Sequence, residues 1–126
     1  MKATSFTDLL VVDDDEVDQE FIQRLLPVHY TIREASLGKA ALLLVKEHRP
    51  DCILLEWHLP DSEGLPLLQW FCSEQLPVIV ITARRNPYLI TQAMQHGAQD
   101  FLLKDELSRI ILEQAIVGAI EGASQK

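Results

Sequence analysis

Leu9-Leu10-Val11-Val12-Asp13-Asp14-Asp15-Glu16 is the stretch that decides the fold, because an apolar run ends abruptly in a run of acids. Continuous apolar runs are typical of strands buried on both faces, as in a parallel sheet that is covered by helices. A second run, Tyr30-Thr31-Ile32-Arg33, alternates apolar with polar residues, as an edge strand does. Three more runs are continuously apolar: Cys52-Ile53-Leu54-Leu55, Val78-Ile79-Val80-Ile81 and Phe101-Leu102-Leu103.

Segments with helical periodicity separate these runs. A helix is expected over residues 106–119, with Asp105 as its N-cap. Its apolar face is wider than packing against one side of the sheet requires. Strands that alternate with helices predict parallel βαβ units with right-handed crossovers. We therefore expect an α/β fold, one doubly wound five-stranded parallel sheet flanked by five helices, in a single domain over residues 1–126. Three apolar stripes support it: Val17, Phe21, Ile22 and Leu25; Leu37, Ala41, Leu44 and Val45; and Ile90, Ala93 and Met94, closed by Gly97.

Composition narrows the class of protein. The 126 residues are 48% hydrophobic, which is enough for one substantial core, and the net charge of −8 argues against direct binding of nucleic acid. No apolar run is long enough to span a membrane, and no signal-peptide core follows the start. Cys52 and Cys72 show no metal or redox spacing, and buried reduced thiols are expected of them. The sequence therefore predicts a cytoplasmic protein.

Polar groups follow the predicted strands at the end where parallel strands carry functional residues. The first strand ends in the acids from Asp13 onward, the third in Glu56, the fourth in Thr82, and the fifth in Lys104. Clustered carboxylates suit Mg²⁺, which prefers oxygen ligands. A hydroxyl and a lysine beside such a metal form a cradle for the oxygens of a phosphoryl group.

Each group alone also has a simpler interpretation. The acids from Asp13 to Asp15, with Asp18, suit the N-terminus of the first helix. Thr82 can simply end a strand, and Lys104 can be a solvated charge at a sheet edge. The combination favours the functional interpretation, because all four groups fall at the same end of successive strands.

The chain resembles the response-regulator receiver family of two-component signalling over nearly its whole length. The resemblance implies a flavodoxin-like sheet with strand order 2-1-3-4-5. It implies that Asp13, Asp14, the acceptor position Glu56 and the backbone carbonyl of His58 hold Mg²⁺. It implies that Thr82 and Lys104 meet the phosphoryl group, and that Phe101 is the switch aromatic. The motifs that carry it are Leu10-Val11-Val12-Asp13-Asp14-Asp15, Ile53 to Asp61 with Gly64, Val78 to Ala83, and Gly97 to Lys104.

Two residues depart from the family pattern. Glu56 stands where the family carries the phosphorylated aspartate, and its extra methylene moves the carboxylate outward by about 1.5 Å. From there Glu56 is expected to accept a hydrogen bond from Thr82 or to pair with Lys104 without phosphate. Asp105 follows Lys104 where most receivers have a proline with a cis peptide bond, so a trans bond is expected here.

These departures favour a pseudo-receiver, or constitutively active-like receiver, that binds Mg²⁺ weakly and regulates a partner through protein–protein contacts. The alternative is an ordinary receiver that a histidine kinase phosphorylates on Glu56 or on a nearby carboxylate such as Asp61. A small Mg²⁺-dependent phosphatase is the third hypothesis, but no nucleophilic elbow or Gly-rich loop supports an enzyme. The partners implied by the family are a histidine kinase or another signalling protein, and a second copy that binds through the fourth helix, fifth strand and fifth helix.

Overall fold

The computed structural model describes residues 6–124, which form one five-stranded parallel sheet with strand order β2-β1-β3-β4-β5. This order confirms the doubly wound fold expected from the resemblance. Residues Tyr30 to Ala35 form an edge strand, as their alternating pattern predicted. The strands are β1 (Thr7–Val12), β2 (Tyr30–Ala35), β3 (Cys52–Glu56), β4 (Val78–Thr82) and β5 (Asp100–Leu103).

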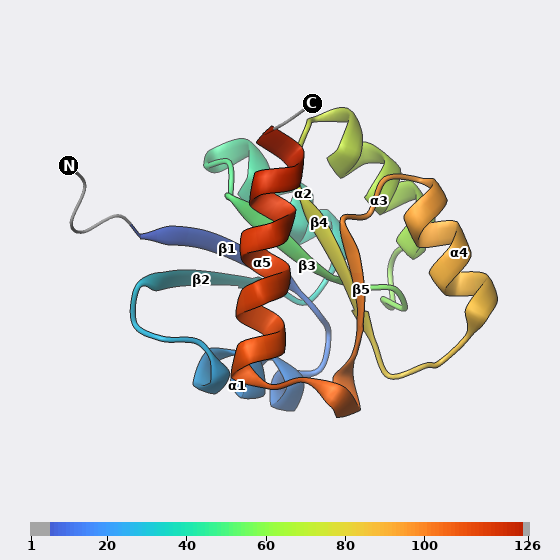
Figure 1. Ribbon diagram of the computed structural model, residues 1–126. Helices are drawn as coiled ribbons and strands as arrows, with labels where there is room; N and C mark the ends of the chain where they lie inside the picture. Colours follow the sequence, from blue (N-terminus) through green and yellow to red (C-terminus); the bar gives the residue numbers. More distant parts are fainter. Residues whose placement is uncertain (1–5, 125–126) are drawn as a thin grey trace.

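Helices cover both faces of the sheet (Figure 1). On one face α1 (Glu16–Leu25) and α5 (Arg109–Ser124) pack against alternate strand residues such as Leu9, Val11 and Leu54. On the other face α2 (Gly38–Glu47), α3 (Gly64–Ser73) and α4 (Pro87–Gln95) pack against Leu10, Ile53 and their neighbours. The central strands are therefore buried on both sides, which explains their continuous apolar sequence.

The predicted stripe of α1 was partly wrong. Ile22 is buried, but the side chains of Val17 and Phe21 are 73% and 43% exposed. The buried face of α1 instead includes Gln19, whose side chain donates a hydrogen bond to the backbone oxygen of Asp13. Val17 and Phe21 lie on the exposed side of α1.

The last helix begins later than predicted, at Arg109, because Lys104–Glu106 form a short 3-10 turn, η1. Asp105 is therefore not its N-cap. Ser108 precedes the helix instead, and its hydroxyl oxygen accepts a hydrogen bond from the Ile111 backbone at 3.2 Å. The broad apolar face is real, since α5 buries Leu112, Ala115, Ile116 and Ala119 and also exposes Ile110, Ile111 and Val117.

Gly97 follows α4 with φ +107°, a conformation that favours glycine just past a helix end, as the sequence predicted. No peptide bond of the described residues is cis, so the expected trans link between Lys104 and Asp105 is present. None of the helices in the described part of the chain is long and apolar enough to cross a membrane.

Candidate functional site

The strand register brings the predicted site residues to one edge of the sheet. Asp13 directly follows β1, and its backbone N–H continues the sheet by donating to Ala35. Glu56 is the last residue of β3, and Thr82 is the last residue of β4. Lys104 directly follows β5, whose end pairs with Thr82 through Leu103. The parallel topology therefore gathers residues that are far apart in the sequence, as the sequence analysis expected.

The Lys104 ammonium lies at the centre of this edge and contacts three carboxylates. Its Nζ atom is 2.7 Å from Glu56 Oε1, 2.9 Å from Asp13 Oδ2 and 2.6 Å from Asp18 Oδ2. The three acids come from β3, from the end of β1 and from α1, so one side chain ties three elements to the chain after β5. We call these four residues the lysine cluster.

The lysine cluster is largely withdrawn from water. The Asp13 and Glu56 side chains are 4% and 8% exposed, that of Lys104 is 16% exposed, and that of Asp18 is 31% exposed. Two of the acids are thus inner partners of Lys104, and Asp18 is the outer one. Ion pairs with such inner partners are screened much less by salt than pairs at the surface.

Burial and pairing have opposite effects on the titration of the cluster. Burial alone would lower the pKa of Lys104, but its hydrogen bonds with Asp18, Glu56 and Asp13 outweigh this and hold the pKa above the ordinary lysine value. Burial raises the pKa of Asp13 above the ordinary value, although the hydrogen bonds from Lys104 and from the Asp15 backbone oppose the rise. Lys104 therefore counteracts the effect of burial on the Asp13 carboxylate.

Both oxygens of Glu56 are engaged within the protein. Oε1 pairs with Lys104, and Oε2 accepts a hydrogen bond from the His58 backbone N–H at 3.0 Å. Of the two partners that the sequence suggested for Glu56, the structure brings Lys104 into contact. The Thr82 hydroxyl oxygen instead accepts a long hydrogen bond of 3.4 Å from the Arg84 backbone.

The remaining predicted residues lie around this centre. Thr82 is buried at the edge, Asp14 is exposed and takes no part in the lysine cluster, and the His58 side chain is exposed. Asp15, rather than Asp13 or Asp14, caps α1, since its Oδ1 atom accepts hydrogen bonds from the backbones of Val17 and Asp18. The helix-cap interpretation of this acidic run therefore holds for Asp15, whereas Asp13 belongs to the lysine cluster.

Phe101 is half buried between the core and the surface. It lines a hollow of about 270 Å³ over β5, between α4 and α5, with Arg85, Ile90, Leu103 and Ile111 among the other lining residues. The hollow adjoins the turn that carries Lys104. Phe101 thus lies beside the face predicted for partner binding.

The carboxylates have the right chemistry for Mg²⁺, but their arrangement in this structure does not fit it. The Asp13 oxygens bind Lys104 and the Asp15 backbone, and the Glu56 oxygens bind Lys104 and the His58 backbone. Within residues 6–124 no group of three or more acidic, histidine or cysteine side chains is arranged to hold a metal ion. The Lys104 ammonium contacts the same two acids, Asp13 and Glu56, that were predicted to hold Mg²⁺.

Asp61, the alternative phosphoacceptor, has a local structural role. Its two carboxylate oxygens accept hydrogen bonds from the Gly38 and Lys39 backbones at 2.8 and 3.2 Å, at the start of α2. The bond from Gly38 is the main reason why the pKa of Asp61 lies below its ordinary value. The carboxylate is therefore committed to joining the loop after β3 to α2.

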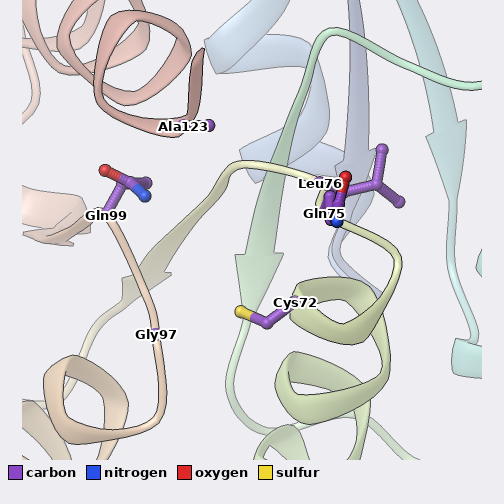
Figure 2. A pocket seen from close by; sticks show the side chains of 6 residues that line it. All are labelled: Cys72, Gln75, Leu76, Gly97, Gln99 and Ala123. Carbon is purple, nitrogen blue, oxygen red and sulfur yellow. The ribbon is translucent and has the colours of Figure 1, made fainter. Parts of the chain in front are cut away.

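A separate pocket of about 200 Å³ lies at the other end of the sheet (Figure 2). Its lining includes Cys72 of α3, Gln75 of the turn after α3, Gly97 and Gln99 of the loop before β5, and Ala123 of α5. Gly97 is close-packed there, since a Cβ atom at this position would lie 2.9 Å from the Cys72 sulfur. This pocket is remote from the lysine cluster and contains none of the predicted site residues.

Sequence reasoning missed Asp18 as a partner of Lys104 and treated it only as a helix-terminal acid. The two residues are 86 positions apart, and nothing local indicates their contact. A signal did exist, because α1 begins only a short loop after the end of β1, and that end shares an edge with Lys104. An acid on the inner side of this turn faces the lysine.

Known protein families and relatives were compared with this chain. Residues 9–116 match the model of the response regulator receiver domain. The chain is 34% identical over 119 residues to the protein named "Probable transcriptional regulatory protein NarL" of Mycobacterium tuberculosis, covering 90% of this chain and 55% of that protein. It is 32% identical over 119 residues to the transcriptional regulatory protein YdfI of Bacillus subtilis, covering 89% of this chain and 56% of that protein.

The solved signal receiver domain of NarL from Mycobacterium tuberculosis has the same fold. The TM-score is 0.84 at 32% identity, and the match covers 94% of this chain and 98% of that domain. The chain spans about half the length of the curated relatives it matches. This chain belongs to the response regulator receiver domain family of two-component signalling.

Proposed function

We propose that this domain is a pseudo-receiver, which regulates a protein partner through surface contacts and does not depend on phosphorylation of its acceptor position. In this proposal the Glu56 carboxylate performs, without phosphate, one task of a phosphoryl group, which is to hold the Lys104 ammonium. The proposal goes beyond family membership, because receivers in general are phosphorylated on an aspartate at this position.

One observation carries the proposal: both Glu56 oxygens already have partners at hydrogen-bond distance, Lys104 at 2.7 Å and the His58 backbone at 3.0 Å. An acceptor oxygen must face the phosphodonor in line, and misplacement by about 1 Å costs about a hundredfold in rate. A glutamate here places its oxygens about 1.5 Å beyond those of an aspartate. Geometry and pairing therefore both oppose phosphoryl transfer to Glu56.

The face formed by α4, β5 and α5 is the surface that we propose for a partner or for a second copy of the domain. It carries Tyr88 (68% exposed), Ile110 (68%) and Ile111 (42%), beside the hollow that Phe101 lines. Lys104 joins the site directly to this face, since η1 follows β5 without a break and Glu106 of η1 pairs with Arg85. A change in the lysine cluster would reach the partner surface along this short path.

We also infer the location and the partner of the domain. It is a cytoplasmic signalling protein with a histidine kinase or another signalling protein as partner, and it has no enzymatic turnover of its own. Relatives such as NarL and YdfI bear the name of transcriptional regulatory proteins. With a net charge of −8, we expect contact with DNA to come from another domain or from a partner.

An intact-mass measurement tests the proposal. The native protein and a Glu56→Asp variant are incubated with Mg²⁺ and a small acyl phosphate, and the mass of each is recorded over time. We expect only the variant to gain one phosphoryl group. A phosphoryl group on the native protein, lost in a Glu56→Gln variant, would establish ordinary phosphorelay on Glu56 instead.

A further inference from the structure

The helix α2 begins without a cap of its own. Leu37, the residue before it, has an apolar side chain, and no acid lies in its first turn. The cap comes from Asp61, 23 positions after Gly38: its Oδ1 atom accepts a hydrogen bond from the Gly38 backbone at 2.8 Å, and its Oδ2 atom accepts one from the Lys39 backbone at 3.2 Å. A carboxylate there satisfies N–H groups that have no partner within the helix, and it suits the helix dipole.

The loop that carries Asp61 also contacts the acceptor position. The His58 backbone N–H donates a hydrogen bond to Glu56 Oε2 at 3.0 Å. His58 pairs with Glu63 in an antiparallel bridge, which closes the segment between them, and Asp61 lies inside that segment. One short closed loop therefore contacts the Glu56 carboxylate at one point and holds the start of α2 at another.

Close packing joins the same loop to α2. Gly38 is buried, and a Cβ atom at this position would lie 2.8 Å from the Ser62 Cβ atom and 3.1 Å from Leu67 Cδ1. The loop therefore lies directly against the backbone of the first turn, with no side chain between them. A shift of the loop toward α2 has to move this turn as well, because packed atoms leave no free space between them.

We propose that Asp61 is a positioning residue of this receiver, which couples the carboxylate at position 56 to α2 through the loop from His58 to Glu63. A change in the Glu56–His58 hydrogen bond shifts the loop, and Asp61 moves the first turn of α2 with it. α2 contacts β2 and β1, whereas the face proposed for a partner includes β5, at the other edge of the sheet. The inference goes beyond the proposed function, because it adds a second route out of the site, and it holds whether or not position 56 accepts phosphate.

Amide NMR spectra of the native protein, Glu56→Gln, Asp61→Ala and the double variant test this coupling. Glutamine replaces a charged acceptor of the His58 hydrogen bond by a neutral one, and charge-assisted hydrogen bonds are about twice as strong as neutral ones. Glu56→Gln should shift the Gly38 and Lys39 amide signals, and the shift should be several times smaller when Asp61 is alanine. A shift of equal size in both backgrounds, or no shift in the native background, would overturn the inference.

Two further variants separate the carboxylate of Asp61 from a general disturbance of the loop. Glu63→Ala is the matched control, because it removes an exposed acid of the same loop whose side chain makes no cap hydrogen bond with α3. It should leave the response of Gly38 and Lys39 to Glu56→Gln at its native size, and a response lost there as well would refute the specific role of Asp61. Asp61→Asn keeps one oxygen that can accept a backbone N–H, so it should retain part of the response.

The same coupling can be tested from the side of α2, since coupling between two sites is reciprocal. Gly38→Ala places a Cβ atom against Ser62 and should shift the His58 amide signal, with Glu56 left in place. Gly118→Ala in α5 is the control, because a Cβ atom there meets nothing within 4 Å, and it should leave the His58 signal unchanged. An unchanged His58 signal in Gly38→Ala would contradict the coupling. Phosphoryl uptake enters neither experiment, so failure here and failure of the proposed function are distinguishable.

Discussion

Replacement of Lys104 by methionine is the perturbation that probes the lysine cluster most strongly. Methionine keeps an unbranched chain of similar volume but has no charge, so the three carboxylates lose their shared cation. The inner pair, Asp13 and Glu56, would then face each other nearly without water, at 4% and 8% side-chain exposure. Removal of one partner from a buried ion pair leaves an uncompensated charge.

The expected loss of folding stability in Lys104→Met follows from how exposed each ion pair is. Breaking a buried pair costs about 3–5 kcal/mol, whereas an exposed pair contributes about 0–1 kcal/mol. Lys104 is 16% and Asp18 is 31% exposed, so the lower end of the buried range applies, and we expect a loss of about 3 kcal/mol at neutral pH. A domain with about 5–15 kcal/mol of stability stays folded after such a loss.

Urea unfolding, followed by tryptophan fluorescence and far-ultraviolet circular dichroism, measures this loss. With a slope of about 1–3 kcal/mol per molar urea, the midpoint should fall by about 1–3 M. Lys46→Met is the matched control, because it removes an exposed lysine from α2. A loss below about 1 kcal/mol would place Lys104 among ordinary surface charges and refute the reasoning.

Three further outcomes follow from the same contacts. The stability difference between the native protein and Lys104→Met should be constant up to about pH 10, because the raised pKa of Lys104 keeps its contribution complete below the ordinary value of 10.5. The contribution then falls as pH rises from 10.5 through the raised value. Unfolding free energies from about pH 7 to 11 check this, and a decline already near pH 8 would contradict it. Asp61→Asn in the Glu56→Asp background should still accept phosphate in the intact-mass assay, because Asp61 caps α2 rather than serving as the acceptor, and loss of uptake would return it to the site. Gly64→Ala should destabilise the domain by about 1–3 kcal/mol and change the fluorescence of Trp57, because a Cβ atom would lie 2.5 Å from its ring; an unchanged melting temperature would show that the ring moves at little cost.

The sheet was predictable because burial dictates composition at each strand. The runs from Leu9 to Val12 and from Val78 to Ile81 are apolar on both sides, since helices cover both faces. Helix faces were less predictable: Val17 and Phe21 fit an apolar stripe but are exposed, and the buried face of α1 includes Gln19, which donates a hydrogen bond to the backbone of Asp13. Periodicity records apolar residues, and it does not record such polar anchors.

The site was predictable in its members and less so in its contacts. Asp13, Glu56, Thr82 and Lys104 lie at strand ends, and the parallel topology alone brings these ends together. Asp18 was missed because its contact with Lys104 depends on how α1 is oriented against the sheet, which the local sequence does not determine. The start of α5 was misplaced for a similar reason, since Lys104–Glu106 form a turn that keeps Lys104 directed at the cluster.

The central claim is that the Glu56–Lys104 contact gives the domain its signalling state without phosphate. Amide NMR spectra of the native protein, of Glu56→Asp, and of phosphorylated Glu56→Asp test it most directly, with the residues of α4, β5 and α5 as reporters. We expect the amide chemical shifts of the native protein at this face to lie closer to those of phosphorylated Glu56→Asp than to those of the unphosphorylated variant. Native shifts that coincide with those of the unphosphorylated variant would contradict it.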